Sequence, residues 1–563
     1  MTTRSPRLIL IFAVLVGLLL AASSGSAATC TLKPKQLDSG RRARTRSALT
    51  PDWLFQLTSS QRFHAQFQPK VVVKDGKEEQ TWTIVNDNPR AFKAVVKKQP
   101  RKYNAEIPFR GVAKLGDQRF GFVLDSPDPD TENYGLLYFD RNGNGDLTDD
   151  PPIESIEVQK EKERVEREKK APKEEKAKGD AKKTDAKEKA KKKAVARRSR
   201  RVGVISRSSS NHTFPPIDLK IKIDGKKVDY RFFFSVYSYF RKNYGYASAS
   251  LTAGVYYEGE IELDGRKQRV VLVDYNSNGQ FDDTSKTTRY SSGRGLTRLG
   301  IQNGDVLFLD PKPVGPAESR NLSSLGFRHS VEKLLCLDGR YFDLKVAPAG
   351  DELTLEPSDI SLGSVTNPNA NYTAVIYGDN GTMTISGTAG KPVAVPEGKW
   401  KLLSYTIDLT KVVEAAEKKA EEVKKAEAEA TKDNAKKEKG TSLFGAMVKA
   451  MTETAGTNVP TRPAVQRPKT TRAVAMATTA GKSITVVKGE TVLLPFGPPY
   501  KPVVAPSYFQ SNNDSLHLGL DLVGSGGEVL TSLTVKGGRP PKPTIKILDP
   551  KGEVVNEGNF EYG

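Results

Sequence analysis

The sequence predicts a mainly β protein, made of several small sandwich-like or barrel-like modules with two long charged insertions that are helical or disordered. Short β-branched and aromatic runs, mostly bounded by Gly, Asp, Asn or Pro, recur along the chain at roughly regular spacing. Two Lys/Glu/Ala-rich segments interrupt these runs and carry no apolar stripe that a helix would bury. Charge pairs at i,i+4 support a solvated helix there, and the same composition is compatible with disorder.

The length of 563 residues is enough for three or four domains of about 100–200 residues. Hydrophobic residues make up 37% of the chain, which favours several modest cores over one large core. We expect the following division: 1–28 signal peptide, 29–50 flexible basic arm, 51–158 first β module, 159–203 Lys/Glu-rich spacer, 204–330 second β module, 331–410 third β module, 411–482 charged helix with a disordered insertion, and 483–563 C-terminal β module.

The expected strands follow the apolar runs in order. In the first module they are 71–73, 81–85, 92–96, 120–124 and 136–139. Later runs are 217–237, 269–273, 305–310, 334–346, 352–356, 372–377, 382–386, 400–409, 483–487, 491–496, 516–524 and 544–555. Asp224-Gly225 and Asp264-Gly265 stand between alternating runs, and such dipeptides favour two-residue hairpins because both residues tolerate positive φ.

The N-terminus has the order of features typical of a secretory signal peptide. Arg4 and Arg7 precede thirteen apolar residues, 8–20, and a small-residue stretch ends near Ala28. Thirteen residues are short of the roughly 20 that a membrane span needs, so we expect cleavage over retention as an anchor. Thr29 makes a poor lipobox before Cys30, which disfavours lipidation. We expect a secreted, periplasmic or cell-surface protein with no transmembrane segment after cleavage.

The cysteine count and the distribution of charge further limit the kinds of protein that this chain can be. The two cysteines, Cys30 and Cys336, give no disulfide framework, so exported modules would rely on cores or on metal ions. We expect Cys336 to be a packed core thiol in an apolar strand. The net charge is +21, and residues 160–201 hold 20 Lys/Arg against 9 Asp/Glu, about half of that excess. The excess of basic residues therefore belongs to a spacer more than to a binding face.

Two Asp/Asn/Gly loops carry the sharpest chemical signal. Residues 134–150 and 268–283 share an apolar strand, then D-x-N-x-N-G, then an Asp pair, which makes a weak internal repeat. Calcium takes six to eight oxygen ligands at about 2.3–2.6 Å, and oxygen-bearing side chains at positions 1, 3 and 5 of a tight loop can converge on one point. Glycine at position 6 allows the sharp turn. The sequence therefore predicts two Ca²⁺ sites.

These loops resemble the EF-hand calcium loop and its relatives without the usual flanking helices, such as dockerins and type-3 thrombospondin repeats. The resemblance covers about eleven residues in each loop. It implies, in loop one, the ligands Asp140, Asn142, Asn144 and Asp146. It implies, in loop two, the ligands Asp274, Asn276, Asn278 and Gln280. Position 7 would act through its backbone carbonyl.

The closing ligand departs from the EF-hand pattern. Pro151 and Ser285 stand at position 12, where a bidentate carboxylate belongs. We expect Asp149 and Asp283, both at position 10, to substitute, with Asp150 and Asp282 as alternates. The competing interpretation is an ordinary Asn-Gly turn without metal, because hairpins use the same residues.

Three functions remain open. The first is a non-enzymatic structural or adhesive protein whose calcium ions rigidify loops. The second is a polyanion-binding protein that uses residues 41–46 and 160–201 to hold acidic polysaccharide, cell-envelope components, anionic lipid or nucleic acid without sequence specificity; the alternative for these residues is a solvated linker. The third is a carbohydrate-active or hydrolytic enzyme. No zinc spacing, nucleophile elbow, phosphate loop or dinucleotide fingerprint occurs, so no catalytic residue is predicted.

Overall fold

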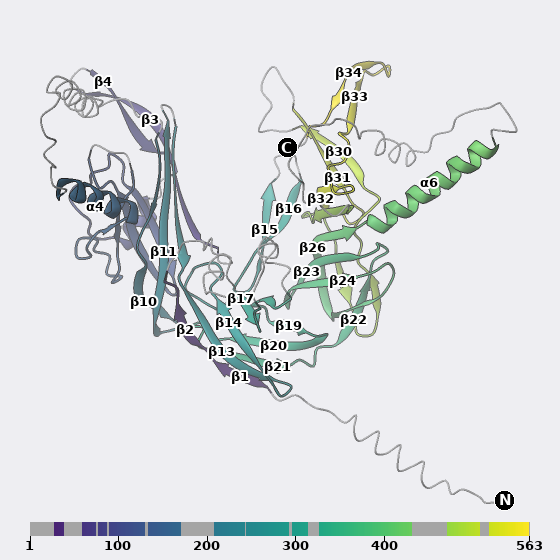
Figure 1. Ribbon diagram of the computed structural model, residues 1–563, viewed down its shortest axis with the longest axis horizontal. Helices are drawn as coiled ribbons and strands as arrows, with labels where there is room; N and C mark the ends of the chain where they lie inside the picture. Colours follow the sequence, from purple (N-terminus) through teal and green to yellow (C-terminus); the bar gives the residue numbers. More distant parts are fainter. Residues whose placement is uncertain are drawn as a thin grey trace, which may run out of the picture. The chain divides into compact units, whose positions relative to one another are not determined.

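The computed structural model describes residues 27–38, 59–74, 77–86, 89–129, 133–170, 208–241, 244–291, 296–312, 326–430, 470–506 and 517–561 (Figure 1). Strands make up 56% of the structure and helices 9%, which confirms the prediction of a mainly β protein. Residues 1–26 of the predicted signal peptide, the basic run 41–46 and most of the spacer 160–201 lie outside the described residues.

The chain divides into two compact units. Unit one contains 1–284, 303–331 and 335–357, and unit two contains 285–302, 332–334 and 358–563.

The largest sheet of unit one has the strand order β10-β11-β12-β3-β4, with β9 also paired to β11 (Figure 1). The strands are β3 (Gln61–Lys74), β4 (Lys77–Ile84), β9 (Ser208–Thr213), β10 (Ile217–Ile223), β11 (Lys226–Arg241) and β12 (Tyr244–Ala253). Strand β10 alternates strictly between buried Ile or Leu and exposed Asp or Lys, as a strand with one core face must. This sheet joins strands from two stretches, 51–158 and 204–330, that the sequence analysis treated as separate modules.

Two further sheets of unit one each have, at one edge, a short strand from near residue 30. Their strands are β1 (Ala28–Thr31), β21 (Glu352–Pro357), β20 (Arg340–Val346) and β19 (Leu334–Leu337) in one, and β18 (Arg328–Ser330), β17 (Val306–Leu309), β14 (Arg266–Val273), β13 (Val255–Leu263) and β2 (Lys33–Gln36) in the other, each in that order. The expected flexible arm, 29–50, is therefore wrong over residues 29–36, where ladder hydrogen bonds and the buried side chains Cys30 and Leu32 fix the chain. These two strands are too short to show an alternation of apolar and polar residues in the sequence.

The last sheet of unit one carries loop one. It consists of β5 (Phe109–Leu115), β6 (Gln118–Asp125), β7 (Leu136–Phe139) and β8 (Ile153–Glu154), flanked by the helices α3 (Pro89–Val95) and α4 (Ile156–Lys170). The run 92–96 was expected to be a strand but mostly belongs to α3, because Phe92 and Val96 lie one helical turn apart and pack together on Val123. Ser155 begins α4 by accepting the N–H of Val158 with its Oγ.

The main core of unit one is a large cluster that contains Phe122, Phe139, Phe232 and Phe234, all of which are fully buried. The predicted hairpins are confirmed on its surface: β10 pairs with β11 around Asp224-Gly225, and β13 pairs with β14 around Asp264-Gly265, with positive φ at all four residues. Each loop predicted to hold calcium leaves this core directly at the end of a buried strand.

Unit two has an eight-stranded sheet in the order β24-β23-β26-β27-β32-β31-β30, with β28 paired to β26. Its strands are β23 (Tyr372–Gly378), β24 (Gly381–Gly387), β26 (Gly398–Asp408), β27 (Arg472–Met476), β28 (Ser483–Val486), β30 (Lys501–Pro506), β31 (Leu518–Val523) and β32 (Val529–Thr534). Smaller sheets contain β15 (Lys286–Ser291) with β16 (Thr297–Gln302), β22 (Leu362–Thr366) between β25 (Val393–Pro396) and β29 (Thr491–Leu493), and β33 (Thr544–Leu548) with β34 (Val554–Asn559).

Helix α6 (Thr410–Ala430) is the charged helix expected at the start of the insertion 411–482. The insertion ends earlier than expected, because β27 is an interior strand of the large sheet with Ala473 and Ala475 fully buried. Its small side chains made the run look like a linker. Among the described residues, no helix is both long and apolar enough to span a membrane.

Candidate metal centres

Both predicted calcium loops begin with a fully buried aspartate. Asp140 follows β7 and Asp274 follows β14, and neither side chain is exposed. Each carboxylate accepts two backbone N–H groups of its own loop. Asp140 accepts those of Asn144 at 3.1 Å and Gly145 at 2.9 Å. Asp274 accepts those of Asn278 at 3.2 Å and Gly279 at 2.7 Å.

The backbones of the two loops turn in the same way. Position 4 is Gly143 in loop one and Ser277 in loop two, with φ of +72° and +60°. Position 6 is Gly145 and Gly279, with φ of +81° and +83°. Positive φ at both positions curls the chain around the side chains of positions 1, 3 and 5, as the D-x-N-x-N-G spacing predicts.

The amides at positions 3 and 5 converge on the aspartate at position 10. In loop one, Nδ2 of Asn142 and Nδ2 of Asn144 donate to Oδ2 of Asp149 at 3.2 and 2.7 Å.

Loop two repeats this arrangement. Nδ2 of Asn276 and Nδ2 of Asn278 donate to Oδ2 of Asp283 at 2.9 and 2.5 Å. The structure therefore brings positions 1, 3, 5 and 10 together in both loops, and places Asp149 and Asp283 where the closing ligand was expected.

The remaining predicted ligands of loop one lie differently. Asp146 forms an ion pair with Lys98 at 2.7 Å and accepts the N–H and hydroxyl of Thr148. These partners lower the pKa of Asp146 to about 2, with the Lys98 hydrogen bond as the largest cause. Asp150, an alternate closing ligand, accepts the N–H of Arg141 at 2.8 Å.

Loop two is more deeply embedded than loop one. Oδ2 of Asp274 also accepts the hydroxyl of the buried Tyr230 at 2.7 Å. Gln280 donates its N–H to Oδ1 of Asn278, and Asp282 is half-buried. Loop one, by contrast, keeps Asn142, Asn144 and Asp149 exposed to solvent.

Asp305 is a further acidic residue at loop two that the sequence analysis missed. Its carboxylate accepts the N–H groups of Tyr275 and Asp283, both at 2.9 Å, and its side chain is fully buried. Burial, followed by the charge of Asp274, raises the pKa of Asp305 well above its usual range. Burial also raises the pKa of Asp274, to about 7. The only signal for Asp305 was its place directly before the apolar run 306–309.

The oxygen-bearing side chains of each loop are of the kind that a hard cation prefers, but they are few in number. No cluster of three or more His, Cys, Asp or Glu side chains able to hold a metal occurs in the described part of the chain. Each loop instead combines two carboxylates with two carboxamides, and calcium accepts both kinds of oxygen. Binding would require the asparagine amides to turn their oxygens, in place of their nitrogens, toward an ion that the position-10 carboxylate also faces. The fit therefore lies in the convergence of the side chains, which the two loops share.

The cysteines have no part in these centres. Cys30 is buried, and burial raises its pKa to about 11. Cys336 was expected to be a core thiol, but it is exposed, because Leu334 and Leu335 of β19 take the buried positions and leave it on the solvent side.

No protein family matches this chain, and no curated protein or solved structure matches it either.

Proposed function

We propose that this is an exported, non-enzymatic, calcium-binding structural or adhesive protein of the cell surface or extracellular space, in which two calcium ions rigidify the ends of β-strands. One observation supports this most: in loops 134 residues apart in the chain, beginning at Asp140 and Asp274, the amides of positions 3 and 5 both converge on the carboxylate of position 10. An ordinary turn needs positive φ but has no need for a carboxylate at position 10 facing two amides.

The loops also hold other segments in place, which is what a structural ion would reinforce. In loop one the carbonyl of Gly145 accepts the N–H groups of Lys97 and Lys98, just after helix α3. In loop two the carbonyl of Asn278 accepts the N–H of Gly116, in the turn between β5 and β6. Because each loop follows a strand and supports a neighbouring turn, an ion would stiffen these connections instead of moving a helix pair.

Thermal melting of the full chain with calcium and with a chelator tests the proposal. An ion that binds only the folded form adds about 2.7 kcal/mol at a concentration of 100 times Kd, so the melting temperature of unit one should rise by several degrees. Asp149→Asn and Asp283→Asn should each remove part of the rise, and the double variant should remove all of it. Asp117→Asn, an exposed turn residue, serves as the matched control.

Calorimetric titration with calcium gives the second measurement. The wild type should bind two ions, and each single variant should bind one. Equal melting temperatures with calcium and chelator, together with no measurable binding heat, would show that the loops are hydrogen-bonded turns and would overturn the proposal.

A further inference from the structure

The hairpin of β10 and β11 carries an unusual pair of charges beside its turn. Three cross-strand pairs occupy its exposed face: Asp218 opposite Arg231, Lys220 opposite Asp229, and Lys222 opposite Lys227. The first two pairs are ion pairs, at 2.7 and 3.6 Å. Directly opposite side chains on one sheet face have Cβ atoms about 4.5–5.5 Å apart, and like charges at that distance destabilise the pairing.

The second hairpin of the same type shows that this like-charge pair is no requirement of the turn. In the β13–β14 hairpin, Glu262 lies opposite Lys267, at the positions equivalent to Lys222 and Lys227 relative to the Asp-Gly turn. The Lys222–Lys227 pair therefore destabilises its hairpin, although the same type of hairpin can hold an opposite-charge pair at these positions. Among the described residues, neither lysine has a carboxylate within ion-pair distance.

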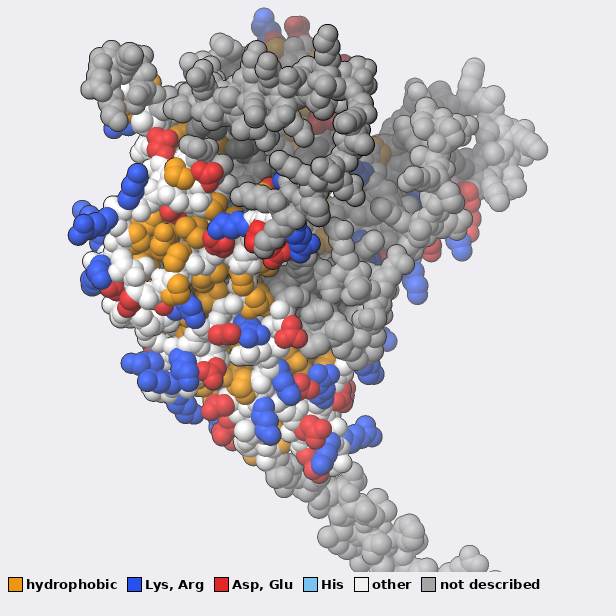
Figure 2. All heavy atoms as spheres, turned by 60° about the vertical axis from the view of Figure 1, so that its left-hand side comes forward, with side chains coloured by type: hydrophobic (Ala, Val, Ile, Leu, Met, Phe, Trp, Pro, Cys, Tyr) orange, Lys and Arg blue, Asp and Glu red, His pale blue; other side chains and the backbone are white. Residues whose placement is uncertain are grey.

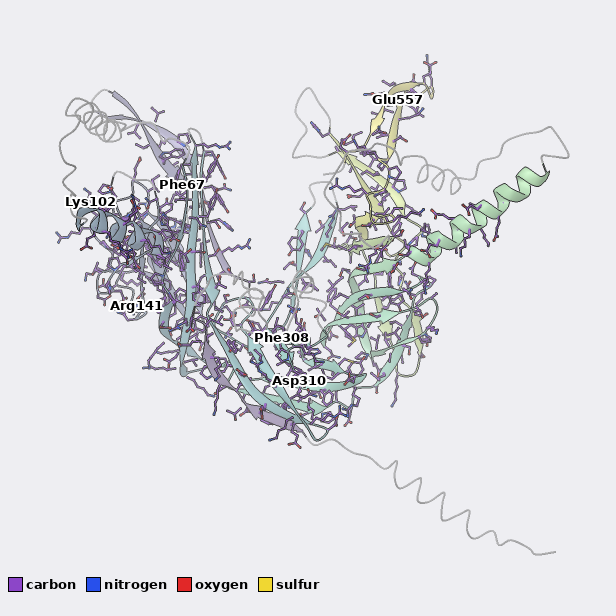
Figure 3. All side chains as sticks on the ribbon, in the orientation of Figure 1. Phe67, Lys102, Arg141, Phe308, Asp310 and Glu557 are labelled. Carbon is purple, nitrogen blue, oxygen red and sulfur yellow. The ribbon has the colours of Figure 1, made fainter. Side chains whose placement is uncertain are left out.

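Both lysines line a groove of about 800 Å³ in unit one, which also contains Arg141 and Asn142 of loop one, and Gln118. Arg141, labelled in Figure 3, lies beside β10 and is exposed, with no ion pair to a described residue. Arg141, Lys222 and Lys227 thus bring three unpaired cations to one groove from two separate elements. Three unpaired cations in one groove favour the binding of an anion.

The other residues of the groove indicate whether the anion carries many charges or few. Asp150, Asp218 and Asp229 also line it, together with the carboxamides of Gln36, Gln118 and Asn142. On the coloured part of the face drawn in Figure 2, basic and acidic side chains interleave without forming a patch of one sign. A nucleic acid carries a phosphate at every nucleotide and would meet the three aspartates. A polysaccharide with a carboxylate on only some of its sugars would place hydroxyl groups there, and carboxylates and carboxamides accept hydrogen bonds from hydroxyls.

We infer that this groove binds an acidic polysaccharide, with Arg141, Lys222 and Lys227 holding the carboxylate of a uronic acid residue. The site borders loop one, which supplies Arg141, but the two lysines stand on a strand hairpin outside that loop. It also differs from the basic segments 41–46 and 160–201, since it needs a particular arrangement of side chains. Charge-assisted hydrogen bonds to a carboxylate are the strong kind, which makes each cation measurable by substitution.

Calorimetry on the full chain tests this inference with three probes. The first is an octasaccharide of alternating glucuronate and N-acetylglucosamine. The second is an N-acetylglucosamine oligomer without carboxylates, and the third is an oligothymidylate of eight nucleotides. Measurement in chelator, at about 150 mM salt to screen non-specific charge, separates the result from calcium binding. We expect the uronate octasaccharide to bind and the neutral oligomer not to bind.

The variants locate the site. Lys222→Glu, Lys227→Gln and Arg141→Gln should each weaken octasaccharide binding about tenfold, as loss of one charge-assisted contact predicts. Lys267→Gln, at the equivalent position of the other hairpin, should bind as the wild type does. Lys222→Glu should also keep or raise the melting temperature, because it restores an opposite-charge pair, so its loss of binding cannot be attributed to unfolding. No binding by the wild type, equal binding by the three variants, or equal or tighter binding of oligothymidylate would each overturn the inference.

Discussion

Nδ2 of Asn144 donates to Oδ2 of Asp149 at 2.7 Å, five residues further along the chain, and Asn278 stands in the same relationship to Asp283 in loop two. The two loops share the geometry of the positions that the EF-hand-like spacing predicted. They also share the aspartate at position 10, where the EF-hand pattern has its closing carboxylate at position 12 instead. The surroundings of the two loops differ, since Asp149 is exposed whereas its counterpart Asp283 is half-buried, and the Asp274 carboxylate also accepts the hydroxyl of the buried Tyr230. Substitutions around loop two should therefore affect stability more than those around loop one.

Gly279→Ala should destabilise unit one strongly. The residue has φ of +83°, and an added Cβ would lie 2.8 Å from the N of Gly116 and 2.8 Å from Cδ1 of Ile221. Strain from positive φ costs about 1 kcal/mol, and overpacking against a fixed backbone adds about 1–3 kcal/mol. Urea unfolding should show a loss of roughly 2–4 kcal/mol from these two effects.

Gly265→Ala is the matched control for this substitution. Its φ is +72° but an added Cβ meets nothing within 4 Å, so only the strain of about 1 kcal/mol should appear. Equal losses for both variants would mean that the close approach of loop two to the β5–β6 turn does not contribute to stability.

Tyr230→Phe should destabilise unit one by about 1–3 kcal/mol, because it removes a hydroxyl donor from a buried carboxylate and leaves Asp274 short of one partner. Tyr257→Phe serves for comparison, since Tyr257 is also buried and its hydroxyl makes no hydrogen bond to the described residues of either loop. Chemical unfolding monitored by fluorescence measures both. A Tyr230→Phe protein as stable as the Tyr257→Phe protein would contradict the assignment of this hydrogen bond as a support of loop two.

The parts of the fold that the sequence predicted share one property, which is that local chemistry determines them. Asp224-Gly225 produces a two-residue hairpin wherever alternating strands flank it, and residues 136–139 form β7 at the predicted bounds. The D-x-N-x-N-G spacing likewise determines the curl of each loop within about ten residues. Such features need no information from distant segments.

The parts that could not be predicted depend on pairing between distant segments. Strand β12 pairs with β3 across about 180 residues, so two expected modules share one sheet. Strand β1 pairs with β21, more than 300 residues away, and this partner orders residues that look like a flexible arm. Asp305 reaches loop two only because β17 pairs with β14. Register between remote strands leaves no periodic mark in either segment.

His329 should make the stability of unit one depend on pH. Burial, followed by the charge of Arg328, lowers its pKa from 6.5 to about 4. The unfolded state therefore binds a proton that the folded state does not bind between pH 6.5 and 4, and the free energy of unfolding should fall as pH falls through that window. The contribution is on the order of 2 kcal/mol after allowance for the partial exposure of the ring.

Urea unfolding of the wild type and of His329→Gln at pH 7, 5.5 and 4.5 isolates this effect. Carboxylates titrate in both proteins, so the difference between the two stability curves reports the histidine alone. That difference should shrink or change in favour of the variant as pH falls. Parallel curves would show that His329 is protonated as easily in the folded protein as in the unfolded one.

Replacement of Glu528 should lower the stability of unit two. Its side chain is only 1% exposed, and its carboxylate accepts the N–H of Gly497 at 2.6 Å, the N–H of Gly526 at 2.9 Å and the hydroxyl of Tyr405 at 3.1 Å. Glu528→Gln keeps the shape but turns one acceptor into a donor that faces an N–H group. We expect a loss of about 1–3 kcal/mol, and faster hydrogen exchange at Gly497 or Gly526. Glu490→Gln, on the surface of the same unit, should change neither quantity, and unchanged exchange in the Glu528 variant would mean that these two N–H groups do not depend on the carboxylate.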